Sequence, residues 1–248
     1  MPTTIPQLLD LARSGMLARL ADLDAVSANL ANANTTGYKR GRLNFQELLD
    51  DRRAALDGTQ TRATQRLMDQ GQLRQTGRPF DLAVDGEGFF AVRLPDGRTA
   101  YTRDGQFQRD ANGQLVSVSG YPLVWDGHPP KDAEEFHVNP DGTVMVKQGE
   151  VWSQAGQVPL TRFANPSGLN GYGQNLWLAT DVSGAPIDGE AGAADFGQIV
   201  GSALESSNVN LADEMTHLLT LQRAYGLSVR AFQQTDQMLG LAIQMRRG

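Results

Sequence analysis

A run of regularly spaced apolar residues near the carboxy terminus constrains the fold more than any other feature. Starting at Leu211 and stepping alternately four and three residues, eight of the ten positions up to Ile243 are apolar. This spacing is typical of a coiled-coil seam, in which a helix buries its stripe against a partner. At about 1.5 Å per residue the segment would form a rod of roughly 50 Å, too long for one helix of a compact small domain. The alternative is an ordinary amphipathic helix that lies on a globular core.

Capping residues predict where this helix begins and ends. Asn210 can accept hydrogen bonds from the free backbone N–H groups of the first turn. Asp213 and Glu214 place carboxylates near the positive end of the helix dipole. Arg246 and Arg247 suit the opposite end, so the predicted helix fills nearly all of the carboxy-terminal segment.

A second long helix is predicted near the amino terminus, after Pro2 and Pro6. Its apolar residues have a mean spacing of 3.5, and they are Leu9, Ala12, Met16, Leu20, Leu23, Val26 and Leu30. Turn-forming residues at positions 32–37 end it. Neither terminal helix has an apolar partner nearby in sequence. We therefore expect the two to pack against each other, or against copies from other subunits.

The segment that follows, residues 38–80, is basic and polar. Nine lysine and arginine side chains stand against five acids between positions 39 and 78. They are not accompanied by interleaved aromatics or by a glycine-rich phosphate loop, so the sequence favours a solvated connector over a nucleic-acid site. Phe45, Leu48, Leu49 and Leu56 predict a short helix that stops before Gly58.

From residue 81 to residue 204 the pattern changes to short β-type runs separated by tight turns. Turns are predicted at residues 95–97, 110–113 and 140–142, where Asp or Asn precedes Gly. Candidate strands cover residues 88–94, 98–102, 114–118, 143–147, 158–163, 175–179 and 196–204, with a loop at 181–195. Repeated hairpins without intervening helices predict an antiparallel β domain, either a sandwich or a distorted barrel. The predicted fold class is therefore α+β.

Composition narrows the classes of function. The 248 residues, 40% of them hydrophobic, suffice for one large domain or two modest ones. The net charge of −6 argues against general nucleic-acid binding, and the absence of cysteine excludes disulfides and thiolate metal sites. Charged residues interrupt the amino terminus, and no 18-residue apolar run occurs. We expect no membrane insertion, and either a cytoplasmic protein or one exported by a signal-independent route.

No catalytic, cofactor-binding or metal-binding constellation is predicted. His128, His137 and His217 lack the spacing of metal ligands. Asp81 and Asp85 on an extended strand would lie about 13 Å apart, beyond the roughly 5 to 9.5 Å that glycoside hydrolysis uses. We therefore expect a protein that is not an enzyme and that needs no cofactor.

Four stretches in order resemble the signatures of one protein family. They are SANLANANTTGYKR at 27–40, DLAVDGEGFF at 81–90, YTRDGQF at 101–107, and GSALESSNVN at 201–210, the last continuing to QRAY at 222–225. Together they resemble the amino-terminal, central and carboxy-terminal signatures of bacterial flagellar rod and hook proteins, nearly end to end. Within the family, the length and the carboxy-terminal half are most similar to the distal rod protein, and next to the proximal rod protein.

The resemblance implies an axial structural subunit of the flagellar basal body, without enzymatic activity. Its terminal helices would form, with those of other copies, an inner tube around the export channel, and the β domain would lie outside them. It would leave the cell through the flagellar type III export apparatus, without a cleavable signal peptide. The implied partners are copies of itself, other rod subunits, the hook protein and the surrounding basal-body rings.

The expected domains are a terminal helical domain at 1–37 and 205–248, the connector at 38–80 and the β domain at 81–204. The predicted assembly interface consists of the apolar seams and two asparagines. Its members are Leu9, Met16, Leu20, Leu23, Asn29, Leu30, Asn32, Leu211, Met215, Leu218, Tyr225, Val229, Phe232, Leu239 and Ile243.

Three positions stand out within the carboxy-terminal seam. Gln222 and Asp236 are its polar members, and either set its register or face a channel. Gly226 interrupts the helix at a cost of roughly 1 kcal/mol relative to Ala.

The sequence leaves several alternatives to a distal rod subunit open. Within the family they are a proximal rod protein or another hook-basal-body protein. From other classes they are a secreted enzyme acting on cell-wall glycan, suggested by the β domain and scattered carboxylates, and a soluble adaptor whose helices pair within one chain.

Overall fold

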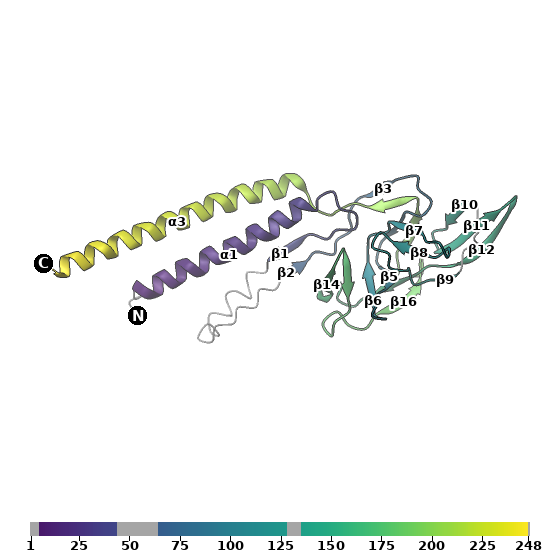
Figure 1. Cartoon of the computed structure of the whole chain (residues 1–248), viewed down its shortest axis with the longest axis horizontal. Coiled ribbons are helices and arrows are strands. Elements are labelled where there is room, and N and C mark those ends of the chain that lie inside the picture. The colour runs from purple at the N-terminus through teal and green to yellow at the C-terminus, as the bar shows by residue number, and fades with distance from the viewer. Residues whose placement is uncertain (1–4, 44–63, 128–134, 248) are drawn as a thin grey trace. The chain divides into compact units, whose positions relative to one another are not determined.

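The computed structural model describes residues 5–43, 64–127 and 135–247, and it combines helices with many short antiparallel strands (Figure 1). The chain divides into two compact units. The first, called the helical unit here, comprises Met1–Ala31, Gly41–Gln65 and Asn210–Gly248. The second, called the β unit, comprises Asn32–Arg40 and Arg66–Val209. The short helix predicted from Phe45 to Leu56 lies outside the described residues.

The helical unit is built on two long helices, α1 (Ile5–Ala31) and α3 (Leu211–Arg247). The strands β1 (Gly41–Leu43) and β2 (Thr64–Arg66) pair with each other. The predicted cap of α3 is confirmed: the Asn210 side-chain oxygen accepts hydrogen bonds from the backbone N–H groups of Ala212 (3.1 Å) and Asp213 (3.4 Å). Within the described residues, neither helix contains a stretch both long and apolar enough to cross a membrane.

The strands of the β unit are short and antiparallel. They are β3 (Leu73–Gln75), β4 (Leu82–Asp85), β5 (Phe90–Arg93), β6 (Thr99–Thr102), β7 (Phe107–Arg109), β8 (Leu115–Ser117), β9 (Asp126–Gly127), β10 (Glu135–Val138), β11 (Thr143–Gln148), β12 (Val151–Gln157), β13 (Pro159–Arg162), β14 (Asn170–Gly173), β15 (Leu176–Leu178), β16 (Ile187–Glu190), β17 (Gln198–Gly201) and β18 (Ala203–Glu205). A 3₁₀ turn at Pro166–Gly168 precedes β14.

These strands form several small sheets, and no closed barrel is present among the described residues. Two sheets have four strands, in the orders β10-β11-β12-β9 and β14-β15-β6-β5. The other pairs in this unit are β13-β16, β17-β4, β18-β3 and β7-β8. The expectation of a distorted barrel is therefore wrong: strands of two to seven residues pair in separate patches, joined by isolated bridges such as Phe89 with Thr161.

Six of the seven candidate strands correspond to β5, β6, β8, β11, β13 and β15. The seventh, at 196–204, is two strands, because Ser202 takes a left-handed backbone (φ 56°) between β17 and β18. The predicted turns are confirmed by backbone hydrogen bonds from Gly97 to Leu94, from Gly113 to Asp110 and from Gly142 to Asn139. The loop predicted at 181–195 contains β16.

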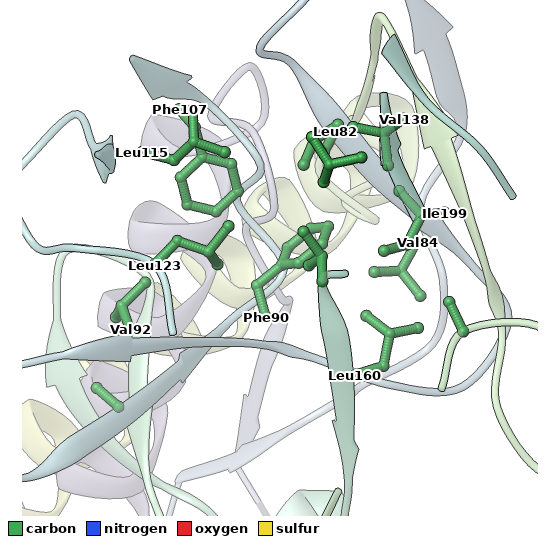
Figure 2. Packing of buried hydrophobic residues seen from close by; sticks show 14 of the residues in the cluster. Leu82, Val84, Phe90, Val92, Phe107, Leu115, Leu123, Val138, Leu160 and Ile199 are labelled. Atoms are coloured by element: carbon green, nitrogen blue, oxygen red, sulfur yellow. The ribbon is translucent and has the colours of Figure 1, made fainter. Parts of the chain in front are cut away.

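One hydrophobic cluster holds the small sheets of the β unit together. Figure 2 shows Phe90 between Leu82 and Val84 on one side and Leu123 on the other. The Phe90 and Phe107 rings meet edge to face, with centroids 5.4 Å apart. Both rings bury apolar surface, and their edge-to-face geometry is favourable for aromatic pairs. Residues distant in sequence, such as Leu82 and Ile199, close the same cluster, which fixes the amino-terminal and carboxy-terminal parts of the β unit to each other.

Candidate assembly site

In the helical unit, α1 and α3 lie side by side and antiparallel (Figure 1). Among the helix side chains that the structure describes, those buried are Glu214 and Leu221 on α3 and Asp22, Val26 and Asn29 on α1. The buried positions of both helices recur at spacings of three, four or seven, as expected for helices that contact each other along one stripe.

Arg19 joins the two helices through its guanidinium. Its Nη1 donates a hydrogen bond to the backbone oxygen of Ala224 (2.6 Å) and another to the hydroxyl of Ser228. The backbone oxygen of Ala224 also accepts from the Ser228 hydroxyl. A charged donor on a helix carbonyl is a strong contact, so Arg19 fixes the register of α1 on α3.

Asp22 places an acid in the same contact. Its carboxylate lies 3.6 Å from Nε2 of His217. Burial raises the pKa of Asp22, the His217 imidazole opposes that rise, and the neighbouring Glu214 carboxylate adds to it. The charged form of Asp22 is therefore disfavoured where α1 meets α3.

Asn29 and Asn32, both predicted interface residues, make contacts within the chain. The Asn29 amide donates to the Gly41 carbonyl (2.9 Å) and its oxygen accepts from the Gly41 N–H (2.8 Å), which pairs the last turn of α1 with β1. The Asn32 oxygen accepts from the Thr35 hydroxyl (3.2 Å) in the turn that follows α1. These contacts give both asparagines a role in shaping the subunit itself.

The predicted seam of α3 does not coincide with the stripe that faces α1. Glu214, Leu221 and Ser228 contribute to the α1-facing stripe, and each immediately precedes a predicted seam position. Leu211 and Met215 are 52% and 53% exposed, and Gln222 is exposed as well. The structure therefore leaves part of the seam uncovered by α1.

The remaining predicted interface residues divide by exposure. Met16, Leu23, Leu30, Leu218, Tyr225 and Val229 are half-buried; Leu20 and Phe232 are exposed. Leu9, Leu239 and Ile243 lie within α1 and α3. Among the described residues of the two helices, the large apolar side chains that are exposed outside the predicted set are Leu219 and Leu227. Neither falls on the alternating steps of four and three residues that begin at Leu211.

In the β unit, a buried ionic cluster joins the amino-terminal signature to the carboxy-terminal one. The Lys39 ammonium lies 2.7 Å from Glu205 Oε1, and both side chains are almost wholly buried. Glu205 Oε1 also accepts from the Gly71 N–H (2.8 Å), and Arg103 Nη1 lies 3.5 Å from Oε2. Lys39 donates further to the Asp69 carbonyl (2.8 Å). Burial lowers the pKa of the Lys39 ammonium, and the Glu205 carboxylate opposes this shift.

The prediction that the basic residues after position 38 are solvated is wrong for Lys39 and Arg66. Others are exposed as predicted, among them Arg42, Arg74 and Arg78. Lys39 is among the largest fully buried side chains of the structure. Arg66 also has partners: its guanidinium donates to the Tyr38 hydroxyl and the Lys39 carbonyl (3.0 Å each) and lies over the rings of Tyr38 and Trp177. Charge counting missed these roles because it says nothing about which basic residues find an acid or a ring in the fold.

Hydrogen bonds of the Asn208 side chain and of the Gly37 backbone strengthen the same junction. The Asn208 oxygen accepts from the Arg40 N–H (2.7 Å), and its amide donates to the carbonyls of Leu67 (2.9 Å) and Asp69 (3.0 Å). Gly37 donates its N–H to the Glu205 carbonyl (2.8 Å). A Cβ on Gly37 would lie 2.5 Å from the Asp104 nitrogen, and its φ is +65°, so only glycine fits there. Residues 37–40 and 205–208 are thus held together within the β unit.

A cavity of 420 Å³ opens beside the cluster, and its lining includes Asp69, Gln70, Glu87, Phe89 and Arg103. Arg103 donates a hydrogen bond to the Gly86 carbonyl (2.8 Å) and stacks over the Phe89 ring at 5.0 Å, so its guanidinium already has partners within the chain. Among the described residues, no group of three or more acids and histidines is placed to hold a metal ion.

Comparison with known proteins identifies the family. Three family models match: "Flagella basal body rod protein" at residues 9–39, "Flagellar hook protein FlgE/F/G D1 domain" at 83–146 and "Flagellar basal body rod FlgEFG protein C-terminal" at 200–245. The first covers most of α1, the second begins in β4, and the third begins in β17 and runs into α3. The matches thus include both signatures that meet at the Lys39–Glu205 pair.

Relatives match over nearly the whole chain. The flagellar basal-body rod protein FlgG of Buchnera aphidicola subsp. Schizaphis graminum is 38% identical over 248 residues, covering 92% of this chain and 95% of that protein. FlgG of Borreliella burgdorferi is 36% identical over 257 residues (95% and 97%), and FlgG of Caulobacter vibrioides is 37% identical over 261 residues (97% and 99%). None of these descriptions names an enzymatic activity. At this identity and coverage, the chain belongs to the family of flagellar basal-body rod proteins, the structural subunits of the rod.

Proposed function

We propose that this chain is a subunit of the distal part of the flagellar rod and that it polymerises through its terminal helices into a hollow axial shaft. The similarity to FlgG proteins over more than nine-tenths of the chain supports this position in the rod. A proximal rod protein, or another hook-basal-body protein of the same family, is the alternative. A cell-wall glycan-acting enzyme is not favoured by any of the matches.

The observation that carries the proposal is the uncovered apolar side of α3. Leu211, Met215 and Leu219 are each more than half exposed, although α3 already contacts α1. Burying one such side chain fully contributes about 1.5 to 3 kcal/mol. Contiguous exposed apolar surface of this kind marks a protein interaction site. Neighbouring subunits would cover this exposed side of α3, and the two helices would then complete a coiled-coil-like assembly.

The proposed division of labour assigns residues 1–37 and 205–248 to the assembly domain, 81–204 to the β domain and 38–80 to the connector. The pairing of α1 with α3 inside one unit supports a helical assembly domain. The two units of the structure differ from these bounds, since residues 32–40 and 205–209 belong to the β unit. The chain passes between the β unit and the helices at two points. The Lys39–Glu205 pair would hold these two points at a fixed distance from each other.

The proposed partners are copies of this chain, the other rod subunits, the hook protein and the basal-body rings. We propose that the flagellar type III export apparatus brings such a subunit to the growing rod. Nucleic acid and the membrane interior are not among the partners.

Deletion of the gene, followed by imaging of purified basal bodies, tests the proposal. We expect a rod that stops short of the hook, with its proximal part present, and restoration by the intact gene supplied in trans. Absence of the whole rod would instead assign the chain to the proximal part. An intact flagellum in the deletion strain would overturn the proposal.

A further inference from the structure

Gly226 lies in the middle of α3, and nothing within the described residues requires a glycine at this position. It has the ordinary helical backbone of α3 and is not among the glycines with positive φ. A Cβ placed on it would meet nothing within 4 Å. Glycine in a helix interior is unfavourable relative to alanine, so the chain carries a destabilising residue at a position where it has room for a side chain.

Gly226 shares one face of α3 with exposed residues. Leu211, Met215, Leu219, Gln222 and Gly226 follow one another at spacings of four, four, three and four residues, so they share one face of α3. All but Gly226 are exposed, and the three apolar members are more than half exposed. Gly226 is therefore a notch in an apolar face that α1 of the same chain leaves uncovered.

Basic side chains border this notch. Arg223 lies one turn before Gly226 and Arg230 one turn after it, and both are exposed. Neither takes part in an ion pair or side-chain hydrogen bond in the described parts of the chain. A partner helix that fits here would carry an acid one turn away from a small residue.

The outer face of α1 has this pattern. Asp24 and Ala28, four residues apart, are both exposed, and Leu20 is exposed one turn before them. Within the described residues, Asp24 has no ion-pair partner. This face is turned away from the α3 of its own chain, because the α1 residues that contact α3, Asp22 and Val26, lie on the opposite side of the helix.

We propose that Gly226 is the crossing point at which α1 of a second copy of this chain packs onto α3. Ala28 of the second copy would lie over Gly226, which places its Asp24 one turn away, beside Arg223 or Arg230 according to the direction of the helix. The interface rests on the proposed function as a polymerising subunit and names the surface that the polymer uses. Two small residues at a crossing let helix axes approach closely, and the charge pair selects the register.

Substitution of Gly226 tests the close approach, with Thr220 as its control. Thr220 is an exposed position of the same helix whose hydroxyl donates to the Thr216 carbonyl, and it lies neither on the face of Gly226 nor on the stripe that faces α1. In cells lacking the native gene, we expect Gly226→Leu to reduce the fraction of basal bodies with complete rods at least tenfold. Thr220→Leu should leave that fraction within twofold of the parent. Circular dichroism of the purified variants checks that both keep parental helix content.

Reversal of the charges tests the identity of the partner. Asp24→Arg alone, and Arg223→Glu with Arg230→Glu, should each reduce the fraction of complete rods. The triple variant should recover most of it, because the pair is rebuilt with opposite signs. Recovery would show that α1 and α3 of different copies meet, since Asp24 faces away from α3 in its own chain.

The outcomes separate this inference from the proposed function. If Gly226→Leu assembles like the parent, or if the triple variant is no better than the single reversals, the crossing is overturned while the rod function stands. If the parent chain restores no rod at all in the deletion strain, the proposed function fails with it. Loss of helix content in Gly226→Leu shifts the decision to the charge reversals, which leave Gly226 in place.

Discussion

At the scale of single residues, the β unit contains two lysine–glutamate ion pairs in different environments. Lys39 and Glu205 approach to 2.7 Å with exposed fractions of 0% and 1%, whereas Lys147 and Glu135 approach to 2.8 Å with 30% and 57%. Water screens the second pair and leaves it worth little. The first has no such screening, so each buried charge depends on its partner.

We therefore predict different outcomes for one substitution at two sites. Glu205→Gln keeps the shape of the side chain but leaves the Lys39 and Arg103 charges without their carboxylate. The free energy of unfolding of the β unit should fall by about 3–5 kcal/mol, as is typical when a buried pair loses one member. Urea unfolding followed by tryptophan fluorescence measures it.

The control is Glu135→Gln, which breaks the exposed pair. Its free energy of unfolding should stay within about 1 kcal/mol of the parent. Equal losses at both sites would mean that burial does not set the importance of the Lys39–Glu205 pair. The sequence alone could not rank the two pairs, because each looks like a surface charge in a polar stretch, and only the fold shows which one lost its water.

At the scale of elements, regular patterns with local causes were predictable. Both terminal helices follow from a period near 3.5, the α3 cap follows from Asn210, and the hairpin turns follow from Asp or Asn before Gly. The stripe that faces α1 was not predictable from apolar spacing, since it includes the polar residues Glu214 and Ser228. Its place depends on Arg19 and on which residues α1 presents, and a single-helix pattern contains neither.

The helix pair carries a pH dependence that follows from Asp22. Its pKa is raised above the ordinary value of 3.8 in the folded chain. The folded state then binds more protons than the unfolded state over the pH range just above 3.8, so stability falls as pH rises through that range. Asp22→Asn should remove this fall. We expect the variant to exceed the parent in thermal midpoint at pH 7, with the difference shrinking as pH approaches 4.

Helical circular dichroism during thermal unfolding at several pH values checks this prediction. His217→Gln is the companion variant: it removes the imidazole that opposes the rise in the Asp22 pKa. The parent's fall in stability should then extend to higher pH. A constant difference between Asp22→Asn and the parent from pH 4 to pH 7 would contradict the assignment to Asp22.

At the scale of the whole molecule, the sequence predicted an α+β chain and its family, but not how the β unit is assembled. Hairpins such as β5–β6 join neighbours in sequence and leave a local signal. Pairs such as β17–β4 and β18–β3 join segments more than a hundred residues apart, and nothing local specifies them. Lys39 and Glu205 belong to the same class of contact. Both lie inside the quoted signatures, yet their pairing required the fold.

The two units should also differ in stability, because they bury apolar surface differently. The β unit encloses a continuous cluster that includes Leu82, Phe90, Val144 and Ile199, all almost wholly buried. In the helical unit, α1 and α3 cover each other along one stripe, while leucines on α3 stay exposed. Helices in water owe most of their stability to packing of an apolar face. We therefore predict frayed terminal helices in the dilute monomer.

Hydrogen exchange at nanomolar concentration, with a monomer demonstrated by sedimentation, measures this difference. Amides of α1 and α3 should exchange at least a hundredfold faster than those of the buried strands β4, β5 and β11, since local opening of the helical unit exposes little core. On incorporation into rods, the helix amides should become protected while the β amides change little. Strong protection of both terminal helices in the monomer would show that the pair is complete within one chain. It would favour an adaptor whose helices need no second copy, because the exposed side of α3 would then contribute nothing to holding the helix in place.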